Sequence, residues 1–226
     1  MTRLRSLIIV GSSFAFAACG AQSQDALLER DGGTDAAEIE AATPADVALA
    51  CSPRGDVTGR TSPYDSAVVS LATVEAKVCY SRPSMRGRVI FGPEGSALVP
   101  YGQLWRTGAN EPTTLHLSGA AEVAGVAVEA GSYSIYTVPG EAEWTVIVNR
   151  STEQWGIESQ YTPEIEAMEV GRAAVRSETM ADAVELFTIR FEPAGADAAD
   201  LVLEWERTRV RVPVAARAAT PVGPAT

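Results

Sequence analysis

The chain has 226 residues, of which 46% are hydrophobic and 21% are charged, and its formal net charge is -11 at pH 7. This length suits one domain with a sizeable core and some appendages, and it excludes a large multidomain enzyme. A surface this acidic repels phosphate backbones, so we expect no nucleic-acid partner.

Residues 1–18 have the organisation of an export signal. Arg3 and Arg5 precede an apolar run that extends through Phe16, and small residues follow it. A positively charged start, a short apolar core and a small-residue end are typical of secretory signal peptides. No later segment approaches the roughly 20 apolar residues of a membrane-spanning helix, so we expect the rest of the chain to be soluble outside the cytoplasm.

The end of this signal, Phe-Ala-Ala-Cys, resembles a bacterial lipobox, in which the cysteine (here Cys19) carries the lipid. Leucine is usual where this chain has Phe16, and Ala15–Ala17 offers ordinary signal peptidase an alternative site. Gly20 follows Cys19, which by the same resemblance favours the outer membrane. We therefore expect a lipoprotein of the cell envelope, anchored in the outer membrane by its lipid and facing the periplasm or the exterior.

Two flanking segments lack the residues for a packed core. Residues 19–60 are mainly small, acidic or hydroxylated, so we predict a flexible acidic tether behind the lipidated cysteine. Residues 216–226 are rich in alanine and proline, and we predict a disordered tail. The folded domain is therefore expected over residues 61–215.

Within the domain the hydrophobic pattern has the period of a β-strand. In the segment 72–80, Val74, Ala76, Val78 and Tyr80 share one face, and Cys79 falls on the other, accessible face. Further short candidates follow at regular spacing, and residues 132–149 read as two arms of a hairpin around Pro139 and Gly140.

The helical signal in the domain is weak. Only residues 163–182 have helical spacing, and Gly171 interrupts them. We therefore predict an all-β fold, an antiparallel β-sandwich or open barrel, with at most one short helix near 163–182.

The three cysteines are an odd number for an exported protein. Lipid attachment at Cys19 leaves Cys51 and Cys79, which can form a disulfide in an oxidising compartment. The alternative is two unpaired thiols.

Several familiar catalytic motifs are absent from the sequence. His116 is the only histidine, which excludes metal sites with several histidines, and Lys77 has no serine three residues before it. There is no G-x-S-x-G elbow, no phosphate-binding glycine loop and no C-x-x-C pair. His116 alternates with two leucines, so it should face solvent or a site. We predict no metal and no cofactor, and a non-catalytic role is favoured over an enzymatic one.

Polar and aromatic residues concentrate in two glycine-broken segments, residues 80–92 and 98–115. One interpretation is structural: the arginines pair with carboxylates or loop carbonyls and hold long connections in place. The other is that these segments line a pocket for a small anionic or sugar-like ligand. The candidate ligand-binding residues are Arg82, Arg86, Tyr101, Trp105, Arg106, Asn110 and Glu111.

The motifs YSRPSMRGRVIFG, LVPYGQLWRTGANEPTTL, AGSYSIYTVPGEAEWTVIVN and LEWERTRVRVPV occur in this order between about Ser62 and Val214. In them the chain resembles the domain-of-unknown-function 2911 family of exported bacterial proteins. The resemblance implies one exported β-rich domain, and it makes the arginine and aromatic segments family features, but it brings no assigned activity. The family commonly has histidine where this chain has Tyr64, which puts in question any role that needs that imidazole.

The sequence thus favours a non-catalytic module that binds a ligand or another envelope protein. The alternative is an envelope hydrolase that uses Glu111 with a second carboxylate, or His116 with a serine.

Overall fold

The computed structural model describes residues 49–217. The predicted signal peptide, Cys19 with most of the tether, and nearly all of the predicted tail lie outside these residues. Among residues 49–217, no helix is long and apolar enough to span a membrane.

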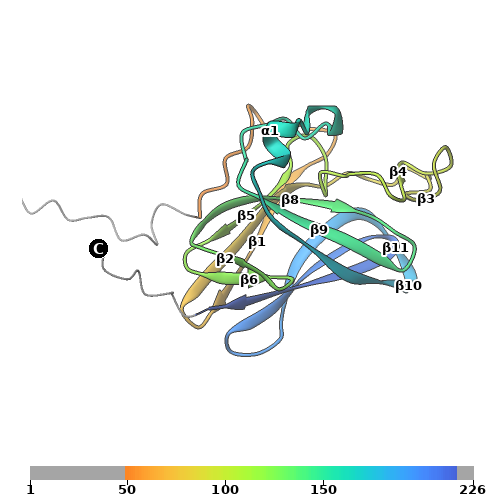
Figure 1. Cartoon of the computed structure of the whole chain (residues 1–226). Coiled ribbons are helices and arrows are strands. Elements are labelled where there is room, and N and C mark those ends of the chain that lie inside the picture. Colours follow the sequence, from red (N-terminus) through yellow and green to blue (C-terminus); the bar gives the residue numbers. More distant parts are fainter. Residues whose placement is uncertain (1–48, 218–226) are drawn as a thin grey trace, which may run out of the picture. The chain divides into compact units, whose positions relative to one another are not determined.

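The described part of the chain is mostly β (Figure 1). Its elements are β1 (Tyr64–Leu71), β2 (Val74–Ser81), β3 (Phe91–Gly92), β4 (Val99–Pro100), β5 (Thr113–Leu117), β6 (Ala121–Val123), β7 (Val126–Val128), β8 (Gly131–Val138), β9 (Glu143–Asn149), the 3-10 turn η1 (Glu158–Gln160), α1 (Pro163–Glu166), β10 (Glu169–Pro193) and β11 (Ala198–Ala216).

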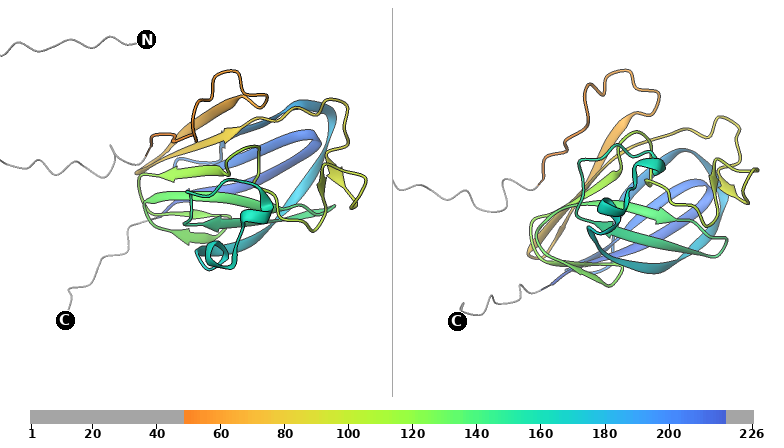
Figure 2. Two further views of the ribbon diagram at one scale, coloured as in Figure 1. Left: turned by 90° about the horizontal axis from the view of Figure 1, so that it is seen from above. Right: turned by 45° about the horizontal axis from the view of Figure 1, so that its top comes forward.

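Nine strands form one antiparallel sheet in the order β1-β2-β5-β8-β9-β10-β11-β6-β7, and β3 and β4 form a small parallel pair. The sheet bends over on itself, so that the β10–β11 hairpin lies across the strands that precede it (Figures 1 and 2). One bridge, Ser84 to Leu186, links the end of β2 to β10, but the sheet does not close into a barrel. The predicted all-β antiparallel fold is confirmed.

β10 makes the bend possible because it belongs to both halves of the sheet. Residues 169–176 pair with β9, and residues 177–193 pair with β11. Two register shifts, on either side of Val184, interrupt the second pairing, and such irregularities increase bending and twist in a strand.

The helix near 163–182 is confined to the four residues of α1, and the chain from Glu169 onward is strand. Pairing with β9 overrides the weak helical spacing of this segment. Gly171 fits the strand because a Cβ at this position would lie 2.9 Å from a methyl carbon of Val126.

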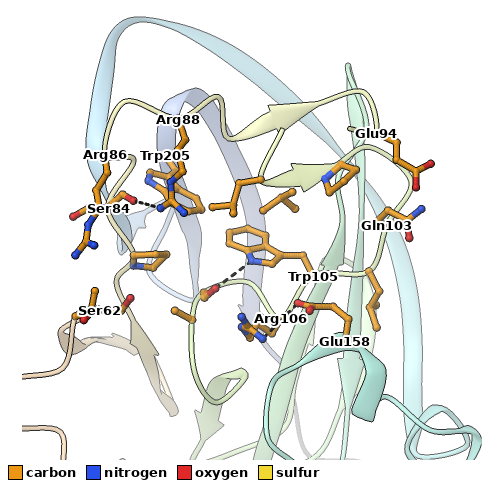
Figure 3. Close-up of a pocket in the computed structure, with 18 residues that line it drawn as sticks. Ser62, Ser84, Arg86, Arg88, Glu94, Gln103, Trp105, Arg106, Glu158 and Trp205 are labelled. Atoms are coloured by element: carbon orange, nitrogen blue, oxygen red, sulfur yellow. Dashed lines mark hydrogen bonds and ion pairs between the residues drawn. The ribbon is translucent and has the colours of Figure 1, made fainter. Parts of the chain in front are cut away.

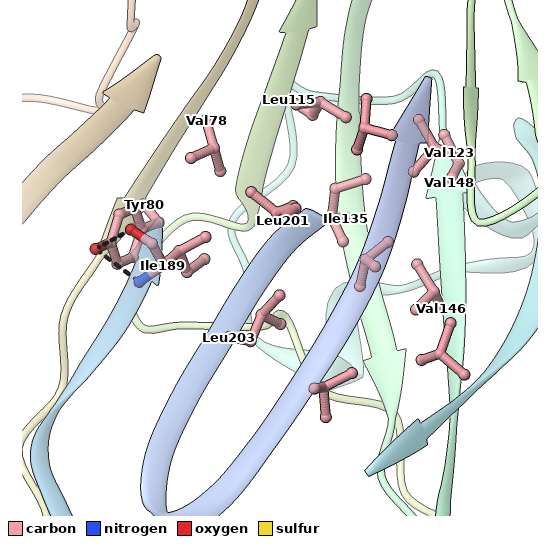
Figure 4. Close-up of a cluster of buried hydrophobic side chains, with 14 of the residues drawn as sticks. Val78, Tyr80, Leu115, Val123, Ile135, Val146, Val148, Ile189, Leu201 and Leu203 are labelled. Carbon is pink, nitrogen blue, oxygen red and sulfur yellow. Dashed lines mark hydrogen bonds between the residues drawn. The ribbon is translucent and has the colours of Figure 1, made fainter. Parts of the chain in front are cut away.

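Apolar side chains from both halves of the sheet meet in one core (Figure 4). Val74, Ala76, Val78 and Tyr80 are all at most 3% exposed, which confirms the alternation expected for β2. The hydroxyl of Tyr80 donates to the carbonyl of Ile189 and accepts from its N–H, at 3.0 and 2.8 Å. This pair of hydrogen bonds fastens β2 to β10.

An aromatic cluster fills the core at one end of the sheet. Trp105 lies at its centre and stacks on Trp205, with ring centroids 5.8 Å apart and planes inclined by 18°. Phe91, Trp144 and Phe187 meet Trp105 edge-on at 5.2 to 6.1 Å. Edge-to-face and offset contacts of this kind stabilise beyond the area they bury.

The segment before β1 is fixed to the domain, although we expected the tether to extend to residue 60. Cys51 forms a disulfide with Cys79, with Cα atoms 5.8 Å apart. Arg60 donates to both carboxylate oxygens of Glu111, at 2.8 and 2.9 Å. Residues 51–60 are therefore anchored at both ends rather than acting as a free linker.

This anchored segment changes the environment of the outer face of the sheet. Cys79 is only 1% exposed, so its expected accessibility is wrong, and His116 is 6% exposed rather than solvent-facing. The alternation of the two faces is still correct, because Cys79 and His116 lie on the face opposite to the core residues next to them in β2 and β5. Ala50, Ser52 and Arg54 line a pocket together with His116, which therefore faces a cavity instead of bulk water.

Candidate functional site

A cavity of about 610 Å³ lies where the connection after β2 meets the connection between β4 and β5 (Figure 3). Arg86, Arg88 and Arg106 bring positive charge to it, and Glu94 and Glu158 bring negative charge. Trp105 and Trp205 form part of its wall. Figure 3 shows Arg86 and Arg88 together on one side of the cavity and Glu94 and Gln103 on the opposite side.

The turn that carries Arg86 and Arg88 is clipped to β10. Met85 donates its N–H to the carbonyl of Glu185, and Phe187 donates to the carbonyl of Pro83, at 2.8 and 2.9 Å. Arg86 has a φ of +51°, an unusual conformation for a residue with a side chain, and its N–H donates to Oε1 of Glu185 at 2.9 Å. These contacts fix the backbone position from which the Arg86 side chain extends.

The two guanidiniums of this turn differ in their contacts. Arg88 donates from Nε to the carbonyl of Met85 at 2.9 Å and from Nη2 to the carbonyl of Ser84 at 2.7 Å. Both bonds are local, and they hold the Arg88 side chain over its own turn. Arg86 is exposed, and its guanidinium has no hydrogen-bond or ion-pair partner among residues 49–217.

Trp105 positions the second loop. Its N–H and C=O form a two-bond bridge with Thr137 of β8, at 2.7 and 2.9 Å, and its ring is drawn into the aromatic cluster. Trp105 Nε1 also donates to the carbonyl of Gly108 at 3.2 Å, which closes the following turn. Arg106, the next residue, is held at the cavity wall by this anchoring.

Gly156 makes room for Arg106. A Cβ on Gly156 would lie 2.4 Å from Cδ of Arg106 and 2.4 Å from the carbonyl oxygen of Asn110. The N–H of Gly156 donates to that same carbonyl at 3.0 Å. Any larger residue would push the loop away, so Gly156 is a packing requirement of the site.

The guanidinium of Arg106 is incompletely paired. Its Nη1 lies 3.7 Å from Oε1 of Glu158, and its buried Nε has no partner within the described part of the chain. The two side chains are 23% and 39% exposed. An ion pair at this distance without a hydrogen bond contributes little stability. The partly exposed Arg106 side chain lines the cavity and therefore retains guanidinium donors for an anion that enters it.

Two of the predicted ligand-binding residues are fully engaged in holding the fold. Arg82 donates from Nε to the carbonyl of Phe187, from Nη1 to Asp65 and from Nη2 to Thr188, at 2.8 to 3.0 Å. The carboxylate of Glu111 is 8% exposed and is bound by Arg60. These contacts follow the structural interpretation of the arginine segments.

Asn110 and Tyr101 also lie away from the cavity wall. Asn110 has a φ of +62° and donates its amide to Oγ of Ser81 at 3.2 Å. Tyr101 packs partly against the hydrophobic core. Of the seven predicted residues, the structure brings Arg86, Trp105 and Arg106 together around the cavity.

Sequence reasoning missed the other side chains that surround this cavity. Arg88 lies in the same quoted motif as Arg86, and Gln103 lies three residues before Arg106, so both had a local signal. Trp205 lies in the quoted motif LEWERTRVRVPV, far along the chain from the other lining residues, and Glu158 lies in no motif and had no signal. Within residues 49–217, no group of three or more histidine, cysteine, aspartate or glutamate side chains could hold a metal ion.

Comparison with known proteins finds a family match for this chain. Residues 62–214 match the model described as "Protein of unknown function (DUF2911)". The chain belongs to the DUF2911 family. No curated protein and no solved structure matches it. Both arginine-bearing loops and Gly156 lie inside the matched DUF2911 region, whereas Cys51 and Arg60 lie outside it.

Proposed function

We propose that this protein is an exported cell-envelope lipoprotein whose DUF2911 domain binds a small anionic, sugar-like ligand in the cavity at Arg86, Arg88 and Arg106. The observation that carries the proposal is the incompletely paired guanidinium of Arg106, with a buried Nε lacking a partner among residues 49–217. Such a cation in a chain with a net charge of -11 is a specific place for an anion.

The shape and composition of the cavity support this ligand class. About 610 Å³ falls within the range of small-molecule sites, 300 to 1,000 Å³. Guanidinium groups bind carboxylates and phosphates through paired hydrogen bonds. Pro83, Pro100 and Leu104 supply apolar wall for the C–H face of a sugar ring, and Gln103 supplies amide donors and acceptors for its hydroxyls.

Export and anchoring are part of the same proposal. The signal-like segment 1–18 and the lipobox-like sequence ending at Cys19 support them. The Cys51–Cys79 disulfide supports an oxidising compartment, where such bonds form and persist. Replacing Cys19 with serine should move the protein from the membrane fraction to the soluble fraction of the producing cell, and continued membrane association would contradict the lipid anchor.

A thermal-shift experiment tests the ligand class. We would compare the parent protein, Arg106→Ala and the control Arg176→Ala, an exposed arginine on β10, in glucuronate, glucose 6-phosphate and glucose. Ligand at 100 times its Kd adds about 2.7 kcal/mol to stability, or roughly 5–10 °C in melting temperature for a domain of this size.

The proposal predicts a shift with at least one of the two anionic sugars for the parent and Arg176→Ala, and none for Arg106→Ala. The absence of any shift with either anionic sugar would contradict it and favour docking of an envelope protein. An equal shift with glucose would show that charge is not what the cavity recognises.

The alternative function is an envelope hydrolase. A hydrolase that uses a pair of carboxylates has less support than ligand binding. Glu111 was its first candidate, and both oxygens of Glu111 are bound by Arg60. A catalytic carboxylate must be free to exchange a proton or attack the substrate. Glu111 is therefore better explained as a structural partner of Arg60.

A further inference from the structure

A second pocket, of about 510 Å³, lies on the outer face of the sheet. One wall is the disulfide-anchored segment, through Ala50, Ser52, Pro53 and Arg54. The other wall is formed by strands β5 and β8, through Thr114, His116 and Ser132. No residue lines both this pocket and the arginine cavity, so the two can be tested separately.

His116 and Ser132 are directly opposed residues of neighbouring strands. His116 Nδ1 lies 2.7 Å from Oγ of Ser132, and Ser132 is exposed while His116 is buried. A hydroxyl within hydrogen-bond reach of an imidazole is the minimum geometry of an activated nucleophile. Because Ser132 is the exposed member, its oxygen is the one that a substrate can reach.

The imidazole is held in its basic form at neutral pH. Burial lowers the pKa of His116, and the positive charge of Lys77, its opposite number on β2, lowers it further. The other charged residues of the pocket are Arg54 and Glu153, and Nη2 of Arg54 lies 3.7 Å from Oε2 of Glu153. A neutral imidazole can accept the hydroxyl proton of Ser132.

We propose that Ser132 and His116 are the nucleophile and general base of a second site that cleaves small carboxylic esters. Ser132 Oγ attacks the ester carbonyl carbon while its proton passes to His116 Nδ1. The tetrahedral intermediate collapses, the carbon–alkoxide bond breaks, and the leaving alcohol takes the proton from His116. Water then attacks the acyl-serine with His116 again as base, which releases the acid and restores Ser132.

The rest of the pocket sets the expected rate. Arg54 is the positively charged residue of its lining and the candidate to stabilise the negative charge on the carbonyl oxygen. Nε2 of His116 has no partner among residues 49–217, so no carboxylate orients the ring there. Disabling the orienting aspartate of a serine-protease triad lowers kcat about 10⁴-fold, so turnover should be slow and acylation is the better readout.

The test is covalent labelling of the disulfide-intact full chain with a fluorophosphonate probe. In this reaction the serine oxygen bonds to phosphorus, fluoride leaves, and the serine proton passes to His116. Intact mass and peptide mapping give the site and the rate for the parent, Ser132→Ala, His116→Gln and the control Ser66→Ala, an exposed serine on β1.

We expect a single label on Ser132, no label in Ser132→Ala, at least a 100-fold slower reaction in His116→Gln, and the parental rate in Ser66→Ala. The parental rate should stay constant as pH falls from 8 to about 6.5 and drop below that, as His116 is protonated. Absence of label on Ser132, or a rate that does not fall on acidification, would overturn the proposal. The pH profile of the parent decides the matter even where His116→Gln folds poorly.

Discussion

The side chain of Glu111 is 8% exposed, and Arg60, its partner, is 12% exposed. A buried ion pair is strongly destabilised when one partner is removed, because the other charge stays out of water without compensation. The backbone N–H of Arg54 also donates to Glu111 Oε1, at 3.3 Å, so the carboxylate holds the N-terminal segment at two points.

We expect Glu111→Gln to lower the free energy of unfolding by about 2–4 kcal/mol, because the amide keeps the shape but leaves Arg60 with an uncompensated charge. The matched control is Glu153→Gln, since Glu153 is 96% exposed in its pair with Arg54 and should contribute less than about 1 kcal/mol. Urea denaturation of both variants measures the difference. Equal losses of unfolding free energy in the two variants would show that burial does not determine how much the Arg60–Glu111 pair contributes to stability.

The sequence only partly distinguishes the residues that line the cavity from the residues that hold the fold together. It marks Arg82 and Arg106 as equivalent arginines beside loop-forming residues. Arg82 is a scaffold residue because it meets the carbonyl of Phe187, which lies 105 positions away in the chain. Contacts over such separations depend on the completed fold, and no local pattern encodes them.

Among the strands, the Tyr80 hydroxyl joins β2 to β10, in addition to the Ser84–Leu186 bridge and the Arg82 contacts that follow β2. Tyr80 satisfies both backbone groups of Ile189, which lies 109 positions away. Tyr80→Phe should therefore lower the free energy of unfolding by about 1–3 kcal/mol, since it leaves a buried N–H and C=O unpaired. Tyr101→Phe should change it by less than about 0.5 kcal/mol, because the Tyr101 hydroxyl has no hydrogen bond among residues 49–217. A loss in Tyr101→Phe as large as that in Tyr80→Phe would contradict this account.

The Cys51–Cys79 disulfide joins the segment before β1 to β2 across 28 positions of the chain. Loop-closure entropy predicts that replacing both cysteines with serine lowers the free energy of unfolding by about 3.5 kcal/mol. Denaturant titrations of the parent, the double variant and the parent under reducing conditions measure this. The reduced parent should match the double variant, and a reduced parent as stable as the oxidised one would show that the bond adds nothing.

The sequence predicted where strands occur, but it did not predict how long they are. Alternation of apolar and polar residues predicted β2 and its inward face. The 25 residues of β10 carry too many exposed small and charged side chains for a period-two pattern, and its second half has two register shifts. Pairing with β9 and β11 determines its conformation, and that pairing is a property of the sheet.

At the scale of the whole molecule, all six tyrosines have a raised pKa, and burial is the largest cause at each. The pKa of Tyr64 rises from 10.0 to about 12, with the Glu111 carboxylate as the second cause. A group that holds its proton more tightly in the folded state stabilises the fold fully below its unfolded pKa, and loses this contribution as pH rises through the folded pKa.

The domain should therefore be stable to alkali up to about pH 10 and lose stability between pH 10 and 12. Tyr64 contributes to this loss through its raised pKa. Urea midpoints measured across this range should fall less steeply in Tyr64→Phe than in the parent, with equal slopes below pH 10. Identical slopes up to pH 12 would show that Tyr64 titrates normally in the folded domain.

Composition and the family motifs were sufficient to predict a β-rich domain of this family. The cysteine count left a Cys51–Cys79 disulfide open as one alternative, but nothing in the sequence predicted the Arg60–Glu111 pair. The alternation of apolar and polar residues therefore marked as exposed a face of the sheet that the segment before β1 covers. That segment creates the second pocket, so the pocket belongs to the assembled molecule rather than to any single motif.

The proposed function requires Arg106 to bind an anion in the cavity. The most direct measurement is an NMR titration of the arginine Nε–H signals of the protein with glucuronate and with glucose 6-phosphate, using Gly156→Ala as a variant with a displaced Arg106 loop. We predict that with at least one of them the Arg106 signal shifts and saturates in the parent, that the Arg82 signal stays in place, and that the response is lost in Gly156→Ala. An Arg106 signal that does not move with either compound in the folded parent would rule out the proposed anion site.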